Sequence, residues 1–186
     1  MTMLANSNQP HALVTGASSQ IGRFLIPRLK IAGFTITAIS RQPQPHQMGI
    51  TWQPLNLQFT TLPFSASQPN FLFHLAPLPL LPLGLARLAQ PTCLKRIIAF
   101  SSTSCFSKCT STDPQERIIA TQLTEAEQSI ISWCQANQVE WTLFRPTLIY
   151  GCGQDKNVSF IAQFIRRWGF FSFVRARARL TPTRSC

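Results

Sequence analysis

Hydrophobic positions along the chain alternate between short β-branched runs and longer stretches with helical spacing. The short runs predict strands at residues 11–15, 34–39, 50–52, 71–76, 96–100 and 139–144. Apolar residues three and four positions apart predict helices at 20–32, 80–89, 115–137 and 157–168. In the first helix we expect the sheet to be faced by Phe24, Leu25, Ile26, Leu29 and Ile31. Strands alternating with helices predict an α/β fold, a doubly wound parallel sheet in a three-layer α/β/α arrangement.

The first predicted strand turns sharply into the first predicted helix. Gly16 allows a tight turn after the strand, and Gly22 allows the new helix to pack closely on the sheet. Such a turn brings backbone N–H groups and the positive end of a helix together, which is the geometry that binds a dinucleotide pyrophosphate. The predicted contacts are Thr15, Gly16, Ser18, Ser19, Gln20, Ile21 and Gly22. The alternative interpretation is an ordinary β–α turn without a ligand.

The end of the second predicted strand carries a further signal. In dinucleotide-binding folds an acidic residue there bonds the ribose hydroxyls and repels a 2′-phosphate. Here Ser40 takes that place and Arg41 follows it, with a guanidinium that can bind phosphate. The pattern favours NADP(H), with NAD(H) still possible, and Arg23 can add positive charge. Alternatively, Arg41 is a surface arginine in a loop.

Four segments, in the right order, resemble the NAD(P)-dependent epimerase/dehydratase-like group of extended short-chain dehydrogenase/reductases. Residues 15–22 resemble its TGxxGxxG turn with Ser19 in place of the middle glycine; against the shorter TGxxxGxG turn, Gln20 replaces it. The others are Asn56-Leu57 for Asp-Leu, residues 71–76 for VxHLAA, and residues 145–151 for RPxxxYG. The resemblance implies a Rossmann-like NAD(P)-binding domain over 10–168.

The same resemblance implies further cofactor contacts. In the family the acid at position 56 contacts the adenine amino group, and Asn56 can make a similar contact through its side-chain oxygen. The segment that passes under the cofactor corresponds to Leu75 and Ala76, with Pro77 in place of the usual small residue.

The resemblance also locates the residues expected to carry catalysis. The Ser or Thr that contacts substrate falls on Thr103, whereas the Tyr-x-x-x-Lys pair falls on Ile119 and Leu123. The only tyrosine is Tyr150, with Gln154 four positions later, so the chain contains no such pair. These two helix positions are consistent with packing. The resemblance therefore implies an NAD(P)-binding protein similar to nucleotide-sugar epimerases and dehydratases but non-catalytic.

Two alternative functions remain open on the sequence. One is an active NADP-dependent oxidoreductase or epimerase that uses another acid or base, such as His74 or Glu116. The other is a regulatory or nucleic-acid-associated module. The net charge is +11, and six arginines lie in the last 21 residues, where no acid occurs. No zinc-finger or RNA-binding motif accompanies them, so we favour a dinucleotide over nucleic acid as partner.

The remaining composition sets the expected environment. The six cysteines form no CxxC pair and no zinc-like pattern with the three histidines, so no metal site is expected. Neither a signal peptide nor a membrane span is visible, which predicts a cytoplasmic protein with reduced thiols.

Residues 169–186 read as a basic irregular tail on a domain without the family's substrate lobe, as a frameshift or early stop would leave; a purposeful basic tail is the alternative. The oligomeric state is not encoded in any visible pattern.

Overall fold

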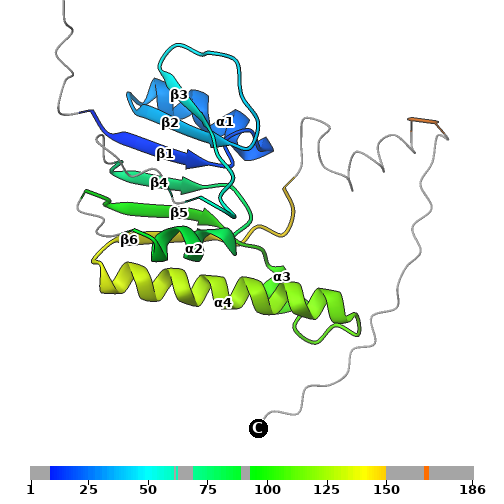
Figure 1. The fold of residues 1–186 in the computed structure, drawn as a ribbon. Helices are drawn as coiled ribbons and strands as arrows, with labels where there is room; N and C mark the ends of the chain where they lie inside the picture. The colour runs from blue at the N-terminus through cyan, green and yellow to red at the C-terminus, as the bar shows by residue number, and fades with distance from the viewer. Residues whose placement is uncertain (1–8, 61, 63–68, 89–92, 150–165, 168–186) are drawn as a thin grey trace, which may run out of the picture. The chain divides into compact units, whose positions relative to one another are not determined.

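The computed structural model describes residues 9–60, 62, 69–88, 93–149 and 166–167. The chain divides into two compact units, residues 1–148 and 149–186, and every strand and helix discussed below belongs to the first (Figure 1). The predicted helix at 157–168 lies outside the described residues except for 166 and 167.

Six strands form one parallel sheet. In chain order they are β1 (His11–Thr15), β2 (Thr35–Ser40), β3 (Ile50–Pro54), β4 (Phe71–His74), β5 (Arg96–Phe100) and β6 (Glu140–Phe144). The spatial order is β3-β2-β1-β4-β5-β6, and every neighbouring pair is parallel. The chain reverses its direction of travel across the sheet between β1 and β4, where α/β folds open a crevice at the carboxyl ends of the strands. The predicted doubly wound parallel sheet is confirmed.

Helices cover both faces of this sheet. They are α1 (Gln20–Ile31), α2 (Leu80–Ala86), α3 (Ser104–Ser107) and α4 (Pro114–Ala136). On one face α1 packs Ile26 and Leu29 against Val14 of β1. On the other, α2 and α4 bury Leu81 and Ile130 in a cluster that includes Leu13 of β1. Because Leu13 and Val14 are sequence neighbours that point to opposite faces, β1 is buried on both sides, as expected of a central parallel strand.

Apart from shifts at the ends of elements, the fold differs from the sequence prediction in two places. Phe24 and Ile31 do not face the sheet: they are 50% and 87% exposed, because α1 buries Gly22, Ile26 and Leu29 against it, with Ile21 and Leu25 partly buried beside them. The short helix α3 was not predicted. Its Ser- and Thr-rich sequence shows no apolar period, and only Cys105 is buried.

Three further observations bear on chemistry. Among the described residues, no helix is both long and apolar enough to span a membrane. In the same residues, no three His, Cys, Asp or Glu side chains gather in a cluster that would hold a metal ion. The described cysteines, Cys93, Cys105, Cys109 and Cys134, are all free thiols.

Candidate functional site

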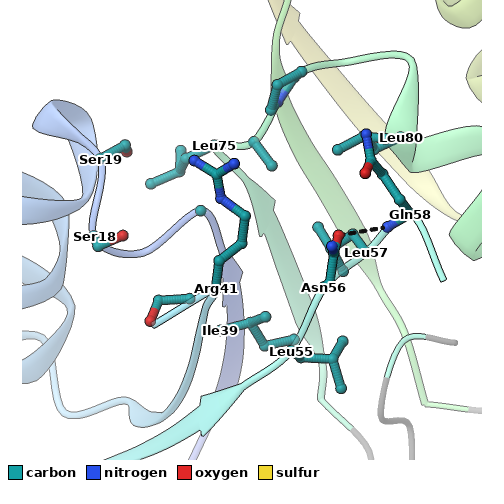
Figure 2. A pocket seen from close by; sticks show the side chains of 14 residues that line it. Ser18, Ser19, Ile39, Arg41, Leu55, Asn56, Leu57, Gln58, Leu75 and Leu80 are labelled. Carbon is teal, nitrogen blue, oxygen red and sulfur yellow. Dashed lines mark hydrogen bonds between the residues drawn. The ribbon is translucent and has the colours of Figure 1, made fainter. Parts of the chain in front are cut away.

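A hollow of about 390 Å³ opens at the carboxyl edge of the sheet, between the segments that follow β1, β2, β3 and β4 (Figure 2). Nine of the predicted cofactor residues line it: Gly16, Ser18, Ser19, Ser40, Arg41, Asn56, Leu75, Ala76 and Pro77. Five lining residues were not predicted: Ile39, Leu55, Leu57, Gln58 and Leu80. Four predicted residues do not line it: Thr15, Gln20, Ile21 and Gly22. The unpredicted residues are mostly apolar, and their side chains carry no phosphate-binding signature.

Gly16 in the β1–α1 turn and Gly22 in the first turn of α1 are required by backbone packing. Gly16 has φ +64°, and a Cβ atom there would lie 2.6 Å from the backbone nitrogen of Ala76. A Cβ on Gly22 would lie 2.0 Å from the carbonyl oxygen of Ala17. Any side chain at either position would therefore displace backbone. The glycines let the turn pack against both the β4–α2 loop and the start of α1.

Ser19 caps α1. Its backbone is extended, with φ −66° and ψ 166°, and its Oγ accepts a hydrogen bond from the Gly22 N–H at 3.2 Å. One of the N–H groups at the start of the helix is thereby satisfied within the protein. The first turn of α1 contains no acid, so its positive end is not neutralised there.

Among the described residues that line the hollow, Arg41 is the only charged one. Its side chain is exposed, and Figure 2 shows the guanidinium reaching over the hollow. The preceding Ser40 is buried and donates its hydroxyl hydrogen to the Gln42 carbonyl oxygen, so this hydroxyl is engaged within the loop. The lining therefore carries one positive charge and no acid, which favours an anionic ligand.

Thr15 and His74 form a buried pair beneath the hollow. His74 Nε2 lies 3.2 Å from the Pro77 carbonyl oxygen, and because a carbonyl can only accept, Nε2 carries the proton. Nδ1 then accepts from the Thr15 hydroxyl at 2.8 Å. Burial lowers the pKa of His74 to about 4, against the smaller raising effect of the Pro77 carbonyl. His74 is thus neutral at pH 7 with both nitrogens engaged, and Thr15 acts by positioning the loops.

The predicted catalytic position, Thr103, lies outside the lining of this hollow. It stands at the start of α3, where its backbone N–H donates to the Pro146 carbonyl oxygen at 3.3 Å. On α4, Leu123 packs against the core as the packing interpretation predicts, but Ile119 is 49% exposed and does not. Neither α4 side chain can exchange a proton.

Glu116, the second possible acid or base, is engaged in an ion pair. Its carboxylate accepts hydrogen bonds from Lys108 Nζ and from the Ser111 hydroxyl, each at 2.7 Å. The hydrogen bond from Lys108, followed by that from Ser111, lowers the pKa of Glu116. The group is therefore a stabilised carboxylate at neutral pH and a poor proton donor.

A half-buried ion pair that the sequence analysis did not foresee ties α4 to the segment after β6. Arg145 donates to Glu127 through Nε at 2.9 Å and through a terminal nitrogen at 2.6 Å, and its guanidinium carbon lies 5.3 Å from the ring centre of Phe106. Burial opposes ionisation of Glu127. The hydrogen bonds and charge of Arg145 outweigh the effect of burial, so the pKa of Glu127 is lowered. The Ser101 hydroxyl, which is buried without a well-aligned hydrogen bond, adds a smaller lowering effect. Arg145 lies in the segment 145–151 that resembles a family motif, and this was the available signal.

The sequence and the fold were compared with those of known proteins. The profile of the NAD dependent epimerase/dehydratase family matches residues 12–169. No curated protein sequence matches the chain.

Several solved structures share the fold. A UDP-glucose 4-epimerase from Thermotoga maritima has a TM-score of 0.64 at 16% identity, over 84% of this chain and 63% of its own. A UDP-glucuronic acid 4-epimerase from Bacillus cereus, in complex with NAD, has a TM-score of 0.59 at 14% identity, over 76% and 58%. An NAD-dependent NDP-hexosamine 5,6-dehydratase involved in tunicamycin biosynthesis has a TM-score of 0.66 at 16% identity, over 86% and 62%. The chain thus spans about three fifths of the length of the structures it matches.

The His74 environment predicts a specific loss of stability in acid. Because the folded pKa is depressed to about 4, the unfolded chain binds a proton near pH 6.5 while the folded chain does not. Stability is therefore full above pH 6.5 and falls by up to about 3 kcal/mol as the pH drops toward 4. Urea unfolding from pH 7.5 to 4.5 should show this loss in the wild type and not in His74→Gln. His46→Gln, at an exposed histidine, is the control, and identical pH profiles for wild type and His74→Gln would contradict the assignment.

The Glu127–Arg145 pair predicts a stability contribution that depends on a charged side chain, whereas that of His74 depends on a neutral one. Glu127→Gln should destabilise the fold by about 1–3 kcal/mol at pH 7, less than a fully buried pair because Arg145 is 36% exposed. Since the folded pKa of Glu127 is depressed, this contribution is present above the unfolded pKa of about 4.3 and is lost as the pH falls through the folded value.

The control is Glu140→Gln, which removes an exposed pair with Arg96 and should cost less than about 0.5 kcal/mol. Equal losses in urea unfolding of the two variants would show that burial of Glu127 contributes nothing.

Proposed function

The chain belongs to the NAD dependent epimerase/dehydratase family, and on that premise we propose that it binds NADP(H) without catalysing the reactions of similar enzymes. Because the chain spans only about three fifths of the structures it matches, their activities and substrates enter here only as part of this proposal.

The observation that carries the cofactor assignment is the charge of the hollow. Arg41 directly follows β2, at the position beside which a dinucleotide places its adenosine ribose, and none of the described residues that line the hollow is an acid that would repel a 2′-phosphate. Gly16, Ser18 and Ser19 would hold the pyrophosphate, Arg41 the 2′-phosphate, and Asn56 with its neighbours the base. When bound, the nicotinamide would supply a hydride-transferring group.

The absence of catalysis rests on the groups that could move a proton. The α4 positions that correspond to the family's Tyr and Lys carry Ile119 and Leu123. His74 has both ring nitrogens engaged, and Glu116 is held as a carboxylate by Lys108 and Ser111. Thr103 can orient a carbonyl or hydroxyl, but a hydroxyl that lacks a neighbouring base is a weak proton carrier.

Cofactor preference is tested by removing the Arg41 guanidinium. Hydrogen bonds to a charged group contribute about 1.5–3 kcal/mol, so Arg41→Ala should weaken NADPH binding by about 10- to 100-fold and leave NADH nearly unchanged. Fluorescence titration of the full chain measures both. Arg28→Ala, which removes an exposed arginine of α1 outside the hollow, should change neither affinity.

Equal weakening of the two cofactors by Arg41→Ala would mean that Arg41 supports the fold instead of contacting the phosphate. No binding of either cofactor by the wild type at millimolar concentration would overturn the proposal.

Catalysis is tested separately by a turnover screen. The full chain, supplied with NAD(H) or NADP(H) and with UDP-glucose, UDP-glucuronic acid or UDP-N-acetylglucosamine, should convert none of them. Product analysis by chromatography detects epimerised, oxidised or dehydrated sugars without relying on a change in cofactor absorbance. Turnover that falls in Thr103→Ala would establish an enzyme with another acid or base.

A further inference from the structure

The hydrogen bond that the Asn56 side chain makes within the protein determines which groups it can offer to a base in the hollow. Asn56 follows β3 and lies on the far side of Arg41 from Ser18 and Ser19 in the view of Figure 2. Its side-chain Oδ1 accepts a hydrogen bond from the backbone N–H of Gln58 at 3.1 Å, which closes a turn of the Asx type.

This hydrogen bond fixes which way the amide points. A backbone N–H can only donate, so the Asn56 atom that faces Gln58 must be the oxygen, and rotating the amide would set two donors against each other. The other end of the amide is the –NH₂ group. Among the described residues it has no hydrogen-bond partner, and the Asn56 side chain is exposed in the hollow. Asn56 therefore presents hydrogen-bond donors to a ligand.

The position of Asn56 relative to the other groups indicates which part of a nucleotide it meets. A dinucleotide places its pyrophosphate on the β1–α1 turn and its ribose beside the end of β2. The next strand outward is β3, so the base that extends beyond the ribose reaches the segment after β3. Leu55 and Leu57 flank Asn56 in this segment and offer apolar contacts to a ring face, which leaves the Asn56 amide for the polar edge of the base.

We infer that Asn56 recognises the base as a hydrogen-bond donor, so that the hollow accepts a 6-oxopurine nucleotide at least as well as an adenine nucleotide. This inference rests on the proposed dinucleotide binding. Adenine carries an amino donor at C6, whereas a 6-oxopurine carries a carbonyl acceptor there. A donor on the protein pairs with the 6-oxo group directly, but with adenine it can reach only a ring nitrogen. An aspartate at position 56 would reverse this preference.

The experiment compares NADPH with its deaminated counterpart, in which hypoxanthine replaces adenine, by calorimetric titration of the full chain. The wild type should bind the deaminated cofactor as tightly as NADPH or tighter. In Asn56→Asp, one carboxylate oxygen can still accept from the Gln58 N–H while the other becomes an acceptor toward the base. This variant should bind the deaminated cofactor about 3- to 10-fold more weakly than NADPH, as expected for one hydrogen bond.

The readout is the ratio of the two affinities, because the added negative charge weakens both anionic ligands alike. Gln47→Glu adds the same charge on the exposed loop before β3, outside the lining, and should leave the ratio at the wild-type value. Intact folding of Asn56→Asp is checked by its circular dichroism and urea midpoint.

The outcomes separate this inference from the proposed function. If the wild type binds NADPH more tightly than the deaminated cofactor, or if Asn56→Asp leaves the ratio unchanged, the inference is overturned while cofactor binding stands. If neither cofactor binds at millimolar concentration, the proposed function fails and the inference fails with it.

Discussion

The direct packing of the β1–α1 turn against the loop after β4 is the constraint on which the hollow depends. Gly16 touches the backbone of Leu75 and Ala76, and the Leu75 N–H donates to the Thr15 carbonyl oxygen at 2.9 Å. Below this contact the neutral His74 ring spans from the Thr15 hydroxyl to the Pro77 carbonyl oxygen. These contacts hold together two loops that are far apart in sequence, and the two loops form one side of the hollow. The loops after β2 and β3 form the opposite side.

The distribution of acids explains why one side of the sheet suits binding while the other is stabilised by ion pairs. Of the six acids in the chain, Asp113 caps α4, and Glu116, Glu127 and Glu140 pair with basic residues around α3, α4, β5 and β6. The lining of the hollow contains none. These four carboxylates are thus engaged in structural contacts, and the described lining of the hollow keeps a positive charge suited to an anion.

Most of the fold could be predicted from the sequence because its signals are local. Residues 11–15 are a short apolar run because β1 is buried on both faces, and the six strands were located with errors only at their ends. The direction in which helix side chains point was less predictable. Phe24 and Ile31 fit a broad apolar stripe along α1 in the sequence, but the sheet covers only a narrower part of that helix. The Glu127–Arg145 pair and the Thr15–His74 pair could not be predicted, since each joins segments that only the strand order brings together. Neither the tautomer of His74 nor the orientation of Asn56 has a sequence signature.

The structure also changes which residues bear on ligand binding. Glycines in a β–α turn are usually interpreted through the phosphate they approach, yet here Gly16 and Gly22 are required by contacts with the protein's own backbone. Ser19 likewise has its hydroxyl engaged by the Gly22 N–H, in the role of a helix cap. The turn would therefore need these residues with or without a ligand. Arg41 and Asn56 differ, because the Arg41 guanidinium and the Asn56 –NH₂ group form no described contact that the fold requires. The ends of β2 and β3 are accordingly better indicators of ligand binding than the glycine motif that first suggested it.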